Sequence, residues 1–156
     1  MGSSSPSPMA RRTHTSVPAR RAGALYGEVL AREFSEPRLL DIHQITVDAY
    51  AVQHPGKRER RTIQSVAVHL MTLALWIERR ADPRAGTELH QRMASRPDYT
   101  WLEPPEPNGT LTIAYVHKAR TFAEHREAVR EWATDVWQAW EPHHTTVRGW
   151  IGRALG

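Results

Sequence analysis

Two segments of this 156-residue chain, residues 38–54 and 58–80, carry apolar side chains on every side of the helices that their patterns predict. A helix that is apolar all round must be buried among other elements, so these two segments have to form the centre of the fold. The first segment ends at His54, because the residue before a proline avoids helical angles. Gly56 then supports the turn that separates the two segments. We therefore predict two central helices that form an antiparallel hairpin about Gly56.

Two amphipathic segments flank this hairpin in the sequence. Residues 19–34 place apolar side chains at three- and four-residue steps among Arg and Glu, which predicts a helix, and Pro37 follows as its stop. Near the C-terminus the same spacing is clearer still, and three tryptophans on one stripe predict deep burial. The residues of that stripe are Val129, Trp132, Ala133, Val136, Trp137 and Trp140.

The region between the hairpin and the last helix is less regular. Prolines accumulate over residues 84–108, which predicts a long connection with one short helix over 87–93. Residues 112–119 fit a further short helix with Thr112 as its cap. The β-rich composition of residues 110–116 also fits a strand, so both alternatives stay open here.

These patterns together predict an all-α fold. We expect a single-domain bundle of four to five helices over residues 19–156, with two central apolar helices and a Pro-rich connection. Residues 1–18 are rich in Ser, Pro and Arg and begin with Met-Gly-Ser-Ser, as an expression leader does. They predict a disordered tail outside this domain.

The composition excludes several classes of protein and of site. Hydrophobic residues make up 40% and charged residues 24%, as in ordinary globular proteins, and the longest apolar stretch, residues 66–77, is too short to span a bilayer. We therefore expect a cytoplasmic protein without a membrane partner. The chain has no cysteine, which excludes disulfides, thiolate zinc sites, iron–sulfur clusters and a cysteine nucleophile. Any metal must bind through His, Asp or Glu.

The net charge and the absence of certain motifs limit the partners and cofactors that we expect for this protein. A net charge of +4 raises nucleic acid as a partner, but Glu59 interrupts the basic run over residues 57–61 and the other arginine pairs are scattered. Solvated helix faces explain these charges better, which disfavours nucleic acid. The sequence has no Gly-rich phosphate loop, no G-x-S-x-G and no H-E-x-x-H, so no organic cofactor is indicated.

Four histidines fall where a bundle would bring side chains together. His43 and His69 are each thirteen residues from Gly56, so an antiparallel hairpin would place them level. The apolar stripe of the last helix continues past Trp140 to His143 and His144, which would face the core if a helix restarts in phase at Pro142.

Several imidazoles that converge from different helices form a common metal site in bundles. We therefore predict that His43, His69, His143 and His144 bind a divalent metal, which could be Zn, Ni, Fe or Mn. The alternative is that each histidine is a core residue hydrogen-bonded to a neighbour.

Other polar residues lie on the central helices as well: Asp48, Gln53, Gln64 and Ser65. Asp48 and Gln64 are each eight residues from Gly56, which favours a structural hydrogen bond that fixes the helix register. The alternative makes Asp48 a catalytic base or the partner of a metal ligand. The remaining histidines fall on polar or irregular segments and are expected at the surface: His14, His90, His117 and His125.

Three short patterns carry a resemblance to known proteins. They are H-x4-D-x-Y-x2-Q-H-P-G over residues 43–56, Q-S-x3-H-L over 64–70 and W-x2-H-H over 140–144. Over about residues 24–150 the chain resembles an uncharacterised bacterial family known only as a domain of unknown function. Many members of that family begin with a cysteine-containing stretch that is absent here, so any metal knuckle in it does not carry over.

The chain is also similar, more distantly, to the DinB-like helical bundles. Those proteins bind a metal through one histidine on an earlier helix and two on the last. His143 and His144 are adjacent, whereas that family spaces the pair by one turn. The resemblance implies a helical fold with a metal site and nothing about a substrate.

Two functions follow from these observations. The first is a metal-dependent protein, in the form of a hydrolase or transferase-like enzyme, with the four histidines under the Pro-rich connection and Asp48 as catalytic residue. The second is a non-enzymatic module with structural histidines, which binds a protein or nucleic-acid partner. The sequence specifies neither a small-molecule substrate nor a protein partner, and a homo-oligomer is compatible with it.

Overall fold

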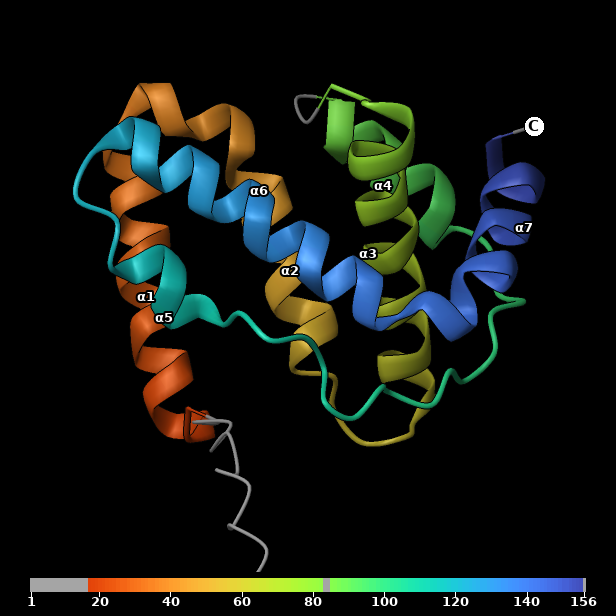
Figure 1. The fold of residues 1–156 in the computed structure, drawn as a ribbon. Helices are drawn as coiled ribbons and strands as arrows, with labels where there is room; N and C mark the ends of the chain where they lie inside the picture. Colours follow the sequence, from red (N-terminus) through yellow and green to blue (C-terminus); the bar gives the residue numbers. More distant parts are fainter. Residues whose placement is uncertain (1–16, 83–84, 156) are drawn as a thin grey trace, which may run out of the picture.

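The computed structural model describes residues 17–82 and 85–155, and within them every regular element is helical. This confirms the all-α class. The predicted tail over residues 1–18 lies outside the described residues, except for its last two positions. The elements are α1 Ala19–Ser35, η1 Pro37–Ile42, α2 His43–Gln53, α3 Arg60–Arg79, α4 Gly86–Ala94, α5 Ile113–His117, α6 Phe122–Ala139, η3 Glu141–His143 and α7 His144–Leu155 (Figure 1).

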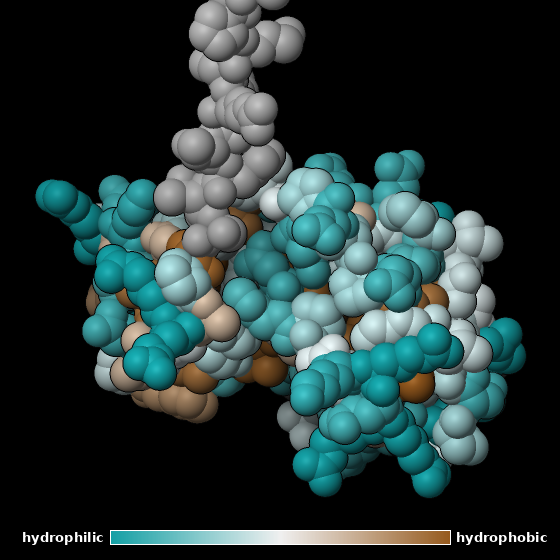
Figure 2. Space-filling model, turned by 90° about the horizontal axis from the view of Figure 1, so that it is seen from below, coloured by the Kyte–Doolittle hydropathy of each residue, from teal (hydrophilic) through white to brown (hydrophobic). Residues whose placement is uncertain are grey.

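The helices form one body around the predicted hairpin. Helices α2 and α3 pack side by side at its centre, and α6 crosses the molecule from α1 and α5 to α3 and α7 (Figure 1). Helix α4 packs against α3 and α7. The face shown in Figure 2 is mostly hydrophilic, with apolar residues visible in scattered areas. None of the described helices is both long and apolar enough to cross a membrane.

The two central segments follow the prediction in outline but not in detail. The segment predicted as one helix over residues 38–54 is divided into the 3-10 helix η1 and the α-helix α2. Pro37 occupies the first position of η1, and the Glu36 carboxylate accepts a hydrogen bond from the Arg38 backbone N–H at 3.1 Å. The division matters for the site, because it makes His43 the first residue of α2.

Local capping explains where the shorter helices begin. The Thr112 side chain accepts a hydrogen bond from the Ala114 N–H, so the predicted cap is confirmed and the strand alternative is wrong. Thr121 caps α6 in the same way through the Glu124 N–H, which starts that helix seven residues before Val129, the first residue of the apolar stripe seen in the sequence.

Helix α7 does not continue α6. The short η3 turn redirects the chain, so that α7 packs against α3 and α4 (Figure 1). Val147, Trp150 and Ile151 are the buried residues of α7. The Arg148 guanidinium donates two hydrogen bonds of 2.9 Å to the Glu78 carboxylate on α3, which fixes the exposed side of this contact.

The part of the Pro-rich connection that follows α4, with the residues up to α5 (95–112), is tied to the helices by Gln53 and Asn108. Gln53 Nε2 donates to the Asn108 and Leu111 carbonyls at 2.9 and 2.7 Å, and its Oε1 accepts from Trp132 Nε1 at 2.9 Å. Asn108 Nδ2 donates to the Val52 carbonyl, and its Oδ1 accepts from Trp140 Nε1. These bonds give Gln53 a structural role at the end of α2.

Replacing Gln53 with leucine should therefore destabilise the fold, because it leaves two carbonyls and the Trp132 N–H without partners. We expect the Gln53→Leu variant to lose about 2–3 kcal/mol of unfolding free energy in urea. The matched control is Gln138→Leu on the exposed face of α6, which should change stability by less than about 0.5 kcal/mol. Equal stability of the two variants would contradict this structural role.

Candidate functional site

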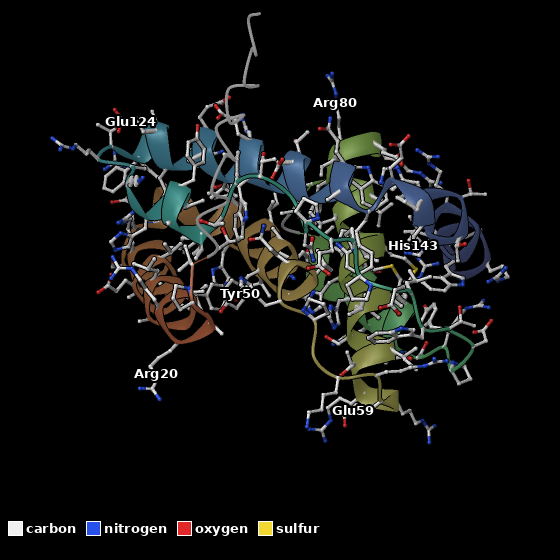
Figure 3. All side chains as sticks on the ribbon, turned by 60° about the horizontal axis from the view of Figure 1, so that its bottom comes forward. Arg20, Tyr50, Glu59, Arg80, Glu124 and His143 are labelled. Atoms are coloured by element: carbon white, nitrogen blue, oxygen red, sulfur yellow. The ribbon has the colours of Figure 1, made fainter. Side chains whose placement is uncertain are left out.

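The four histidines predicted as metal ligands have separate partners in the structure. His43 contacts Glu33 on α1, and His69 contacts Asp48 on α2. His143 and His144 lie together at the α6–α7 junction (Figure 3 labels His143). Across residues 17–82 and 85–155, no three His, Asp or Glu side chains are grouped so that they could hold one metal ion. The predicted convergence of these histidines is therefore not found there.

Helical geometry explains why His43 and His69 do not meet. Asp48 is the residue of α2 that faces His69, and it follows His43 by five positions. At 3.6 residues per turn these two side chains leave α2 in directions about 140° apart. Equal distance from Gly56 predicts similar height along a hairpin, but it does not predict that both side chains face the partner helix.

His143 and His144 each donate a hydrogen bond to a backbone carbonyl at the α6–α7 junction. His144 stacks on the Trp137 indole with ring centroids 3.8 Å apart, and its Nε2 donates to the Trp137 carbonyl at 2.7 Å. His143 Nε2 donates to the Glu103 carbonyl of the Pro-rich connection at 2.8 Å. The stripe of α6 does not continue in phase through η3, so the two imidazoles secure a helix junction rather than point into the core.

A buried carboxylate that the sequence analysis did not single out lies at the other end of the molecule. Glu33 is completely buried and accepts hydrogen bonds from His43 Nδ1 at 2.9 Å, Thr46 Oγ1 at 2.6 Å and His125 Nε2 at 2.8 Å. The other ring nitrogen of His125 lies 3.2 Å from an Arg32 guanidinium nitrogen. Since the guanidinium can only donate, His125 Nδ1 accepts and Nε2 carries the proton given to Glu33.

His125 was expected at the surface, and that prediction is wrong, because its exposed fraction is 0%. The apolar spacing of α1 and α6 could have revealed that Glu33 and His125 are buried. Glu33 lies four positions after Val29 on the stripe of α1, and His125 lies four positions before Val129 on the stripe of α6. Polar side chains on an apolar stripe have to find partners in the core, and these two find each other.

The second buried carboxylate is Asp48, which is hydrogen-bonded to His69. It has no exposed surface, and its Oδ1 accepts from His69 Nδ1 at 2.7 Å and from Gln44 Nε2 at 2.9 Å. Its Oδ2 accepts from Trp76 Nε1 at 2.9 Å. Burial raises the pKa of the Asp48 carboxyl, while the hydrogen bonds from His69, Trp76 and Gln44 oppose that shift.

The register bond expected between Asp48 and Gln64 does not form. Gln64 instead donates to the Ala94 and Arg96 carbonyls at 2.8 and 3.1 Å, where it holds the end of α4 against α3. Asp48 does link α2 to α3, as the structural interpretation required, but it does so through His69 and Trp76.

His69 lines a cleft of about 790 Å³ between α3 and α4, which we call the α3–α4 cleft. Its Nε2 has no hydrogen-bond partner in the described part of the chain, so this nitrogen is free to meet a ligand. The polar residues that line the cleft come from α3, from α4 and from the segment that follows α4: Arg60, Arg61, Gln64, Ser65, His69, His90, Ser95, Arg96 and Tyr99.

His90 was predicted at the surface but is half-buried in this cleft. Its ring lies edge-on to that of His69, with centroids 5.5 Å apart. Burial lowers the pKa of His90, and the neighbouring His69 adds to that shift. His69 and His90 are therefore the two imidazoles that the α3–α4 cleft offers to a ligand or a metal ion.

A second cavity of about 490 Å³ is less suited to chemistry. It lies beside His54 and residues 106–110, and its lining includes Gln53 and Asn108. Both amide side chains already have their oxygen and nitrogen atoms bonded within the protein. The α3–α4 cleft is therefore the better candidate site.

The Glu33 cluster should contribute to stability rather than to catalysis. We expect Glu33→Gln to lose about 2–3 kcal/mol of unfolding free energy, because an amide nitrogen then faces donors that need an acceptor. Glu127→Gln on the exposed side of α6 makes the same chemical change and should be nearly neutral. Urea unfolding followed by tryptophan fluorescence measures both, and a neutral Glu33→Gln variant would show that the cluster adds no stability.

Comparisons with known proteins assign no activity to this site. No curated protein and no solved structure matches the chain, so the likeness to DinB-like bundles stays a prediction. A family model described as a family of unknown function, DUF5946, matches residues 22–141, which include both buried carboxylates and His69. As the patterns over residues 43–144 predicted, the chain belongs to a domain-of-unknown-function family, DUF5946.

Proposed function

We propose that the α3–α4 cleft is the active site of a hydrolytic enzyme in which His69 is the general base. The observation that carries this proposal is the contact between the fully buried Asp48 and His69 Nδ1, at 2.7 Å, beside a cleft of about 790 Å³. A carboxylate on Nδ1 fixes the ring orientation and the tautomer, so that Nε2 is the nitrogen that can accept a proton.

The proposed step is a proton transfer coupled to nucleophilic attack. His69 Nε2 takes the proton from the attacking hydroxyl as the new bond forms, and it returns that proton to the leaving group as the old bond breaks. Asp48 stabilises the imidazolium in between. Its own position is fixed by Trp76 and Gln44, so His69 is held in one orientation before a substrate binds.

Substitution of Ser65 tests which hydroxyl group attacks the substrate. It lies one helical turn before His69 on α3 and lines the same cleft. A water molecule could attack directly, or the Ser65 hydroxyl could attack and form a covalent intermediate that water then hydrolyses. A Ser65→Ala variant that keeps its turnover supports direct attack by water, and one that loses it supports the covalent route.

Replacement of His69 should separate catalysis from folding. We expect His69→Gln to lose at least about 100-fold in hydrolysis of chromogenic carboxylic and phosphoric esters, because the amide cannot accept the proton. Its N–H can still donate to Asp48, so stability should be largely kept. His69→Leu leaves Asp48 without one donor and should cost about 1–3 kcal/mol.

Two controls complete this experiment. His54→Gln, at the second cavity, should keep full turnover, whereas Asp48→Asn should lower turnover because Asp48 orients His69. Turnover that survives His69→Gln would refute the proposal. A wild-type protein that turns over no ester, with a His69→Leu variant less stable than His69→Gln, would favour the non-enzymatic binding module.

A second candidate keeps the divalent metal that the sequence predicted and places it in this cleft. The rings of His69 and His90 lie 5.5 Å apart, and a carboxylate on Nδ1 is the contact that commonly orients a metal-binding imidazole. His69 and His90 would supply two ligands, and water or substrate would complete the set. The metal would then act as a Lewis acid on the bond to be cleaved.

Elemental analysis of untagged protein tests this candidate. After incubation with Zn, Ni, Mn or Fe and dialysis, we expect about one ion per chain and a raised thermal midpoint, because an ion that binds only the folded state stabilises it by mass action. His90→Gln should abolish both effects, and His144→Gln should not. If none of the four ions is retained, or if His90→Gln retains it, the metal candidate is wrong.

A further inference from the structure

We infer that the substrate of the α3–α4 cleft is a small molecule with a phosphate or carboxylate group, which Arg60, Arg61 and Arg96 bind. This inference rests on the proposed function, because it concerns the same cleft. It adds the charge of the substrate and the distance between its charged group and the bond that is cleaved.

The first argument is that these three guanidinium groups are unpaired. Arg60, Arg61 and Arg96 all line the cleft, and none has a side-chain hydrogen bond or ion pair among residues 17–82 and 85–155. Elsewhere on the surface arginines do pair, as Arg126 does with Asp41 and Arg148 with Glu78. The guanidinium groups of Arg60, Arg61 and Arg96 thus have no protein carboxylate that a ligand would have to displace.

The second argument is that the cleft has no negative charge at its surface to balance them. Its lining contains no Asp or Glu, and the nearest carboxylate in the network, Asp48, is completely buried behind His69. Arg60 and Arg61 also occupy the first turn of the 20-residue helix α3, where the helix dipole adds positive potential. An anion that enters this cleft meets three guanidinium groups and no carboxylate among the lining residues.

The third argument concerns shape. Arg96 comes from the segment after α4, and Gln64 fixes that segment by donating to the Arg96 carbonyl at 3.1 Å. Arginines from two walls of one cleft can bind the oxygens of one phosphate or carboxylate from two sides. A cleft of about 790 Å³ has the size of a small-molecule site.

The spacing along α3 gives the length of the substrate. Arg61, Ser65 and His69 follow one another at four-residue steps, so they lie along one face of the helix. Arg61 and His69 are thus about 12 Å apart along the helix axis. The charged group should therefore lie at one end of the substrate, with the scissile bond about two helical turns away.

Calorimetric titration with inorganic phosphate and, separately, with succinate at constant ionic strength tests this inference. We expect saturable binding of at least one anion, weakened about tenfold or more in an Arg61→Gln/Arg96→Gln double variant. The matched control is Arg20→Gln/Arg21→Gln on α1, where both arginines are exposed and unpaired and the anion affinity should stay unchanged. Which anion binds distinguishes a phosphorylated from a carboxylated substrate.

Two further measurements keep the test decisive. In wild-type protein, the bound anion should protect Arg61 and Arg96 from phenylglyoxal, with the modified residues mapped by mass spectrometry. This readout does not depend on how the double variant folds. His69→Gln should retain anion binding although it loses turnover, so failure of the anion site and failure of the general-base proposal give different results.

Several outcomes would overturn the inference. They are the absence of saturable binding for both anions, equal binding by the Arg61→Gln/Arg96→Gln variant, and protection of arginines outside the cleft only. Tight binding of a single-stranded oligonucleotide that is lost in the Arg61→Gln/Arg96→Gln variant would overturn it as well, because the cleft arginines would then belong to a nucleic-acid surface.

Discussion

Burial of the Asp48 carboxylate is the constraint on which the centre of this protein depends. A carboxyl group without exposed surface has to receive hydrogen bonds from its surroundings, and Asp48 receives them from one residue of its own helix and two of α3. The bonds from α3 hold the two central helices in one register. They also orient His69, so the interaction that stabilises the hairpin prepares its imidazole for chemistry.

The two buried carboxylates differ in whether a histidine bonded to them can reach a ligand in a cleft. Glu33 has two imidazole partners: His125 uses both ring nitrogens inside the protein, and His43, which bonds to Glu33 through Nδ1, lines neither of the two cavities described above. Asp48 engages only one nitrogen of His69, and that histidine borders a cleft. A pair of this kind is structural where both nitrogens are occupied. It becomes a candidate for catalysis where one of them is free and the imidazole borders a cleft, and the proposed function rests on Asp48 for that reason.

The sequence predicted most of the fold, because the apolar spacing that marks each helix is a local property. It also identified Asp48 and His69, since polar residues within an apolar helix stand out. It could not predict which side chains would face each other, because that depends on the rotation of each helix and on the turn at η3. His43 and His144 were therefore grouped with His69 although their partners are Glu33 and the Trp137 carbonyl. The Asp48–His69 contact and the role of His90 required the packed structure.

Helix α3 is a single unbroken helix of 20 residues from Arg60 to Arg79, and this has a consequence for how the cleft could change during evolution. Adding or removing one residue between Arg61 and His69 would rotate one relative to the other by about 100° and take them off a common face. Only a change of a whole turn, about 5.4 Å, restores the alignment. If these residues bind the two ends of one substrate, their spacing along α3 sets the length of that substrate. Relatives could then differ in substrate length only by whole helical turns.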